Sequence, residues 1–202
     1  TQPRAVVDSS HSPLVVVCST TQIADFARNI AGDRWQVRSI LAPGQDPHLY
    51  EVRPGDAMVV AQASLCLENG WHLEGGDWMR RLAQQAGKPI VACVDGVEPY
   101  RLAESDEEFD DPHAWFTAGN ASIYVENIVR ALSVADPRHA NEYRERARLY
   151  QQQLTVLDRW IRDQIESIPA DRRVLVTSHD AFNYFCREYG LRAAAPVGWR
   201  SE

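Results

Sequence analysis

The sequence has no long apolar run, few cysteines and few histidines. Its 202 residues include four cysteines and six histidines, and no apolar segment approaches the length that a membrane-spanning helix needs. No Cys-x-x-Cys pair is present, which excludes the common cysteine-based zinc motifs. Because three of the four lie in or beside apolar, strand-like segments, we expect buried free thiols at Cys18, Cys66, Cys93 and Cys186.

A surplus of positive charge is also absent. Asp and Glu number 28 against 21 Lys and Arg, which gives a net charge of −7 at pH 7. This balance argues against nucleic acid or an anionic membrane surface as the main partner, and it is compatible with a cationic ligand. With 45% apolar and 24% charged residues, the composition is typical of a soluble globular protein.

Strand-like and helix-like patterns alternate through the first two thirds of the chain. Strands are expected within residues 13–21, 35–44, 64–70 and 88–96, and helices within 22–32, 53–63, 77–87 and 118–133. Alternation of this kind predicts βαβ units and a parallel sheet, so the fold class is α/β. The stretch 96–115 is rich in Asp and Glu and lacks a helical period, and we interpret it as an exposed acidic loop.

A sustained amphipathic pattern predicts one long linking helix over residues 136–169. Asp136 stands at the N-cap position, Pro137 at the first helical position, and Pro169 ends the pattern. The apolar residues recur at helical spacing and are expected to form a stripe buried against both flanking regions: Tyr143, Ala147, Tyr150, Leu154, Leu157, Ile161, Ile165 and Ile168.

The strand-then-helix pattern resumes after the long helix. A strand over 174–176 and a helix over 181–189 predict the first βα unit of a second α/β lobe in residues 170–202. A lone strand cannot form a sheet, so we expect either a longer protein or self-association through this region. The predicted organisation is therefore a disordered lead-in (1–12), an N-terminal α/β lobe (13–135), the linking helix (136–169) and an incomplete C-terminal lobe (170–202).

Asp-Pro-His occurs twice, in PGQDPHLYE (43–51) and DDPHAWFTAGN (110–120). Proline restricts its own φ and keeps the preceding Asp out of the helical region, so each His is expected on a stiff loop. His48 and His113 follow predicted strands, and His179 ends the strand at 174–177. Ligands of open α/β sheets gather at the carboxyl ends of strands, and imidazole is a common metal ligand. These three residues are therefore candidate metal ligands, whereas His11, His72 and His139 are interpreted as surface or capping residues.

At the level of longer motifs the sequence resembles the metal-binding solute-binding proteins of bacterial ABC importers for zinc, manganese or iron. The resemblance rests on the two Asp-Pro-His loops and on three further segments in the same order: CLENGWHLEGGDWM, DPRHANEYRERARLYQQQL and TSHDAFNYFCREYGL. It implies that His48, His113 and His179 are the first three metal ligands. The family's fourth ligand, a carboxylate near the end of the second lobe, has no counterpart within these residues.

The resemblance also implies a role and a location. It predicts a protein with no enzymatic activity, periplasmic or otherwise extracytoplasmic in a bacterium, that passes a divalent metal to a membrane permease. Any membrane association would come from the permease or from a lipid anchor outside this chain. Histidine as third ligand favours zinc, with manganese next; the His-rich loop common in zinc members is missing.

Two other classes remain open from the residues alone. A zinc hydrolase also uses three protein ligands and an open water position. It needs a general base near the metal-bound water, and Asp46, Asp111 and Asp180 are candidates that more plausibly orient the neighbouring His. A purely structural module built around the long helix would leave the Asp-Pro-His repeat unexplained.

Overall fold

A four-stranded parallel sheet organises the first part of the molecule. The fold is taken from a computed structural model that describes residues 14–104 and 107–195, so the lead-in expected at 1–12 lies outside the described residues. The strands β1 (Leu14–Cys18), β2 (Trp35–Ser39), β3 (Leu65–Glu68) and β4 (Ile90–Ala92) pair in the order β2-β1-β3-β4. The α/β class and the parallel sheet predicted from the alternating patterns are confirmed.

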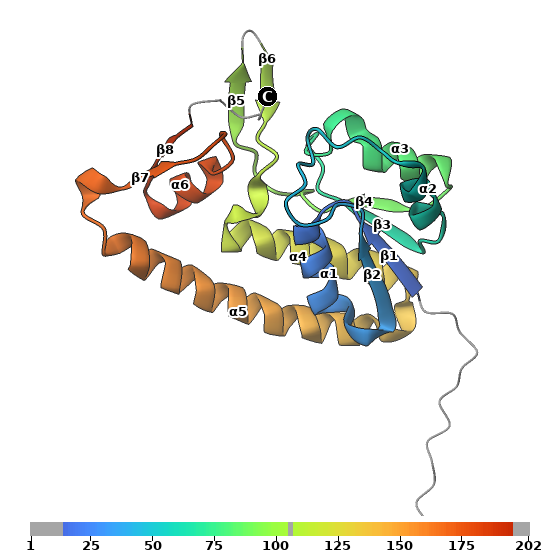
Figure 1. The fold of residues 1–202 in the computed structure, drawn as a ribbon. Coiled ribbons are helices and arrows are strands. Elements are labelled where there is room, and N and C mark those ends of the chain that lie inside the picture. The colour runs from blue at the N-terminus through green and yellow to red at the C-terminus, as the bar shows by residue number, and fades with distance from the viewer. Residues whose placement is uncertain (1–13, 105–106, 196–202) are drawn as a thin grey trace, which may run out of the picture.

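Helices cover both faces of this sheet (Figure 1). Alternate residues of β1 enter two separate cores: Val16 and Cys18 pack with α1 (Thr21–Ala31) and α4 (Ala118–Ala135), whereas Val15 and Val17 pack with α2 (Pro54–Ala61) and α3 (Trp78–Gln85). Burial on both faces explains why β1 is continuously apolar. All four cysteines are buried free thiols.

The middle of the acidic stretch forms a β-hairpin, so the interpretation of that part as a loop was wrong. Strands β5 (Arg101–Glu104) and β6 (Glu107–Asp110) pair antiparallel. Leu102 stands opposite Phe109, and an ion pair of 2.9 Å joins Arg101 to Asp110. The pairing depends on contacts across the hairpin, which a search for helical periodicity and apolar runs does not detect.

The long helix α5 spans Ala140–Glu166 and follows a short 3-10 turn at Pro137–His139. Its first half packs on α1 and α4, with Tyr143, Ala147 and Leu154 buried. Beyond Leu154 the expected stripe is only partly buried, because Leu157 is 45% exposed while Ile161, Ile165 and Ile168 are half-buried. Other 3-10 turns lie at Gly32–Arg34, Gly75–Asp77, Ala114–Phe116 and Ala170–Arg172.

After α5 the chain forms a small unit with two strands, which corrects the expectation of one. Strand β7 (Val174–Val176) pairs in parallel with β8 (Arg192–Ala194), and α6 (Asn183–Tyr189) connects them. The tripeptide of β8 has only small or charged side chains and gives no apolar pattern. Tyr189 on α6 donates a hydrogen bond of 2.9 Å to Asp158 on α5.

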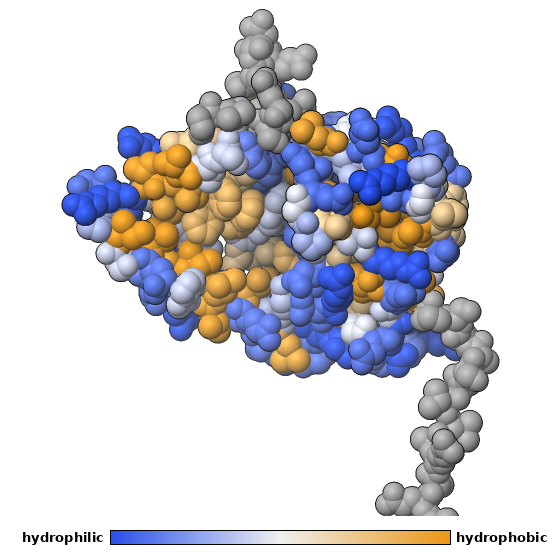
Figure 2. All heavy atoms as spheres, viewed as in Figure 1, coloured by the Kyte–Doolittle hydropathy of each residue, from blue (hydrophilic) through white to orange (hydrophobic). Residues whose placement is uncertain are grey.

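Apolar surface gathers over this unit and the end of α5 (Figure 2). The exposed large apolar side chains there include Val156, Leu157, Trp160 and Val176. None of the helices in the described residues has the length and apolar character required to cross a membrane.

Candidate metal centre

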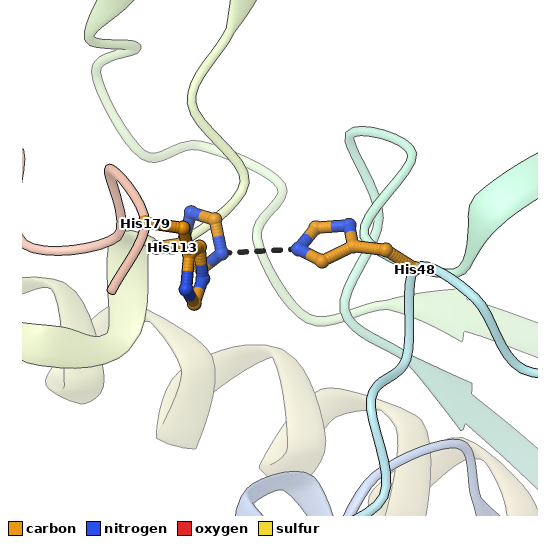
Figure 3. Close-up of side chains that lie close together, drawn as sticks. All are labelled: His48, His113 and His179. Atoms are coloured by element: carbon orange, nitrogen blue, oxygen red, sulfur yellow. Dashed lines mark hydrogen bonds between the residues drawn. The ribbon is translucent and has the colours of Figure 1, made fainter. Parts of the chain in front are cut away.

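Three imidazoles from distant parts of the chain converge between the parallel sheet and the unit that contains α6. The structure brings His48, His113 and His179 together, with one ring nitrogen of each within 4.8 Å of the others (Figure 3). The Nε2 atoms of His48 and His113 are 3.2 Å apart. Two nitrogens at 2.0–2.1 Å from a tetrahedral zinc ion lie roughly 3.3 Å apart, so this spacing fits a shared cation.

The other three histidines do not join this group. His72 is an exposed loop residue with a positive φ of 59°. His139 contacts the carboxylate of Asp136 through Nδ1 at 2.8 Å, at the start of the long helix. His11 lies outside the described residues.

The repeated Asp-Pro-His tripeptide forms the same local structure twice. The backbone N–H of His48 donates to Asp46 Oδ1 at 2.8 Å, and that of His113 donates to Asp111 Oδ1 at 3.0 Å. Each Asp side chain thus bonds to the backbone two residues later, as in an Asx-turn, while the intervening proline restricts the turn. The repeated tripeptide therefore fixes the backbone of the histidine at its third position in both loops.

Side chains beside the parallel sheet donate hydrogen bonds to the carbonyl oxygens of Pro47 and Pro112. Trp78 Nε1 donates to Pro47 O at 3.3 Å, and Asn69 Nδ2 donates to Pro112 O at 2.9 Å. Asn69 is itself oriented by Tyr124, whose hydroxyl donates to Asn69 Oδ1 at 2.8 Å. Sequence reasoning assigned no role to these supports, although the CLENGWHLEGGDWM motif contains two of them.

Close packing also holds the first histidine loop. A Cβ atom added to Gly75 would lie 2.0 Å from the backbone oxygen of His48. The loop that contains Gly75 is conformationally unusual, because Trp71, His72 and Asp77 all have positive φ. Glycine is therefore required at residue 75 by the approach of the His48 backbone.

His113 is the most constrained of the three imidazoles. It is 3% exposed, and its Nδ1 contacts Asp111 Oδ1 at 2.8 Å. An ionised carboxylate is only an acceptor, so this contact favours the tautomer with the proton on Nδ1 and a lone pair on Nε2. That lone pair is directed at His48, as metal ligation requires.

His179 lies on the loop between β7 and α6. Its carbonyl oxygen accepts hydrogen bonds from Thr177 Oγ1 at 2.8 Å and from Ala181 N at 2.9 Å. Burial, followed by the neighbouring His113 ring, lowers the pKa of His179. A lowered pKa keeps the imidazole neutral at physiological pH, which is the form that binds a metal.

Two buried carboxylates lie beside the carboxyl end of β3. Glu74 is 2% exposed and accepts hydrogen bonds from Ser19 Oγ at 2.5 Å and Asn69 N at 2.7 Å. Glu68, also 2% exposed, forms an ion pair with Arg80. Burial, reinforced by the negative charge of Glu74, raises the pKa of Glu68 to about 7.

Glu68 should make the stability of the protein depend on pH. Between its unfolded pKa of about 4.3 and its folded pKa of about 7, the folded state holds a proton that the unfolded state has lost, so stability falls as pH rises. In the wild type, titration of Glu68 should lower the free energy of unfolding by about 2–3 kcal/mol between pH 5 and pH 7.5. We expect this decrease to be absent in Glu68→Gln, whose side chain does not titrate. Urea unfolding at both pH values measures the difference. Identical pH dependence in the two proteins would show that Glu68 is already ionised at pH 5.

Comparison with known proteins places the chain in a family. Residues 16–202 match the family model of ZnuA, described as zinc-uptake complex component A, periplasmic. The manganese-binding lipoprotein MntA of Bacillus subtilis is 39% identical over 193 residues, which are 94% of this chain and 62% of that protein. The chain belongs to the ZnuA family, and it spans less than two thirds of the length of this relative.

Solved structures agree with this assignment. The periplasmic zinc-binding protein TroA of Treponema pallidum is 37% identical and superimposes with a TM-score of 0.85, covering 93% of this chain and 68% of that chain. The Mn-bound periplasmic metal-binding protein from Candidatus Liberibacter asiaticus is 32% identical with a TM-score of 0.81, over 94% and 70% of the two chains. The family resemblance stated from the sequence motifs is confirmed.

Proposed function

We infer that this chain is the metal-capturing part of an extracytoplasmic substrate-binding protein, which delivers a divalent transition metal to an ABC permease. The observation that carries the proposal is the convergence of three imidazoles, of which His113 is held by a buried carboxylate. His48, His113 and His179 are the proposed ligands. The cation would be cargo, bound through neutral nitrogens and released again.

Zinc is the favoured metal, with manganese second. Three imidazole ligands suit zinc better than manganese, which prefers oxygen donors. The names of the relatives include both metals, since MntA is manganese-binding and TroA is a zinc-binding protein. A further oxygen ligand would move the site toward manganese.

A hydrolytic function receives less support from the geometry. A metal hydrolase needs a general base within reach of the metal-bound water. Asp111 is fully buried and already accepts from the backbone and ring of His113, and Asp46 accepts from the backbone of His48. These two carboxylates orient the candidate ligands. The relatives named above are likewise binding proteins, and we propose the same for this chain.

Titration of the metal-free chain with Zn²⁺ and with Mn²⁺ tests the proposal. We expect calorimetry to give one site per chain, with tighter binding of Zn²⁺, because all three candidate ligands are nitrogen donors. Elemental analysis of the purified protein gives the metal that it retains. Absence of binding by either ion would contradict the proposal, and metal-dependent hydrolysis of ester or phosphate substrates would favour the enzyme.

A further inference from the structure

The carboxylate of Asp111 connects the second histidine to helix α6. Asp111 is fully buried, and its Oδ1 atom accepts from the ring Nδ1 and the backbone N of His113. Its other oxygen, Oδ2, accepts a hydrogen bond of 3.0 Å from Nδ2 of Asn183, the first residue of α6. Asn183 is 7% exposed, so this bond is shielded from water.

The next residue of α6 holds the backbone on which this carboxylate stands. The hydroxyl of Tyr184 donates to Asp111 O at 3.1 Å and accepts from Tyr100 N at 2.8 Å. Asp111 N donates in turn to Tyr100 O at 2.8 Å. Tyr100 precedes β5 and Asp111 follows β6. The Tyr184 hydroxyl therefore hydrogen-bonds α6 to the residues that flank both strands of the hairpin. The main chain of Asp111 is therefore fixed independently of its side chain.

We propose that Asn183 is a positioning residue for metal capture: its amide fixes the Asp111 carboxylate, which fixes the His113 ring and its tautomer. The inference rests on the proposed function of the three imidazoles. Tyr184 fixes the backbone of Asp111. Rotation of the Asp111 carboxylate is limited instead by the hydrogen bonds that its two oxygens accept. Among the described residues, Asn183 supplies the side-chain donor to Oδ2.

Loss of this donor would act on His113 in two ways. A buried carboxylate oxygen without a partner is costly, so the carboxylate turns to share its remaining donors. The Nδ1–H···Oδ1 bond to His113 then bends, and the tautomer with the proton on Nε2 becomes more populated. In that tautomer Nε2 has no lone pair for a metal.

Asn183 also positions the ring of His113 relative to the ring of His179. The loop that contains His179 leads directly into α6, at whose start Asn183 lies. A single side chain thus ties the ring of His113 to the element that follows His179. The rings of these two histidines have centroids 5.3 Å apart. The pair is therefore arranged before any cation arrives.

The test compares Asn183→Leu with the wild type and with Asn127→Leu. Leucine has a similar size to asparagine and no donor. Asn127 is the matched control, because it is also buried and its Nδ2 donates to the backbone carbonyl oxygens of Cys93 and Asp95 rather than to a carboxylate that holds a histidine. Nitrogen NMR of the metal-free proteins reports the ring tautomer of His113, and calorimetry gives the Zn²⁺ affinity.

We expect Asn183→Leu to lose part of the Nδ1-protonated tautomer and to bind Zn²⁺ about 10-fold more weakly, as loss of an outer-shell partner typically does. Asn127→Leu should lose stability and keep both properties. A folded Asn183→Leu protein with wild-type tautomer and affinity overturns the inference. If Asn183→Leu does not fold, Asn183→Ala is measured in the same way, with the same two outcomes.

Failure of the proposed function gives a different result. If the wild-type chain binds neither Zn²⁺ nor Mn²⁺, metal capture is contradicted. The tautomer measurement uses the metal-free protein, so a shift of His113 in Asn183→Leu still supports the positioning role of Asn183. An unchanged tautomer in that experiment overturns it.

Discussion

Replacement of His48 by alanine is expected to weaken Zn²⁺ binding at least about 100-fold, since loss of an outer-shell partner alone costs 10–100-fold. His48 is only partly buried and lies on a loop, so the substitution should leave the fold intact. His113 is a less clean target. It is 3% exposed and donates to Asp111, so its removal would also leave a buried carboxylate short of a donor.

His139→Ala is the matched control for His48→Ala. Like His48, His139 is partly buried, but its ring contacts the carboxylate of Asp136 at the start of the long helix and does not join the three-histidine group. We expect this variant to bind Zn²⁺ with wild-type affinity. Calorimetry at a single pH compares the three proteins. Equal affinities for His48→Ala and the wild type would remove His48 from the site.

Replacement of Gly75 by alanine should disturb the site without touching a ligand. The new Cβ would lie 2.0 Å from the carbonyl oxygen of His48, and a backbone atom cannot move aside as the end of a flexible side chain can. The His48 loop must therefore shift. We expect a loss of about 1–3 kcal/mol in the free energy of unfolding from overpacking. The displaced ring should bind Zn²⁺ about 10-fold more weakly, the scale of a lost outer-shell contact.

Gly119→Ala provides the control for Gly75→Ala. Gly119 lies in α4, and a Cβ added there meets nothing within 4 Å. Alanine favours a helix over glycine by about 0.5–1 kcal/mol, so this variant should be slightly more stable with unchanged affinity. Urea unfolding and calorimetry measure both quantities. A Gly75→Ala protein that resembles Gly119→Ala would show that the His48 loop moves without cost.

Much of the fold was predictable because the patterns that encode it are local. A strand buried on both faces has to be continuously apolar, as in β1, and a helix packed on one side repeats its apolar residues every three or four positions. Even so, the pattern overestimated the buried part of α5. Leu154 is buried and Leu157 is 45% exposed, since burial also requires an element to pack against.

The three histidines could be selected from the sequence for a similar reason. His48 and His113 each follow Asp-Pro, and His179 ends a predicted strand, so their positions were readable before any fold was known. In the structure only His48 follows a strand of the parallel sheet, whereas His113 follows β6 of the hairpin and His179 follows β7 of a separate two-stranded sheet. The family resemblance pointed to the same residues.

The tertiary structure alone decided which other residues support them. Gly75 approaches the backbone of His48, and Asn183 bonds to Asp111; both partners are distant in the sequence. A glycine in a loop and an asparagine at a helix start have many ordinary explanations, and no local pattern distinguishes these two. The sequence by itself determined the four-stranded parallel sheet, the helices that cover it and the candidate ligands. Contacts between distant segments, which form only when the elements pack, decided how the imidazoles are held.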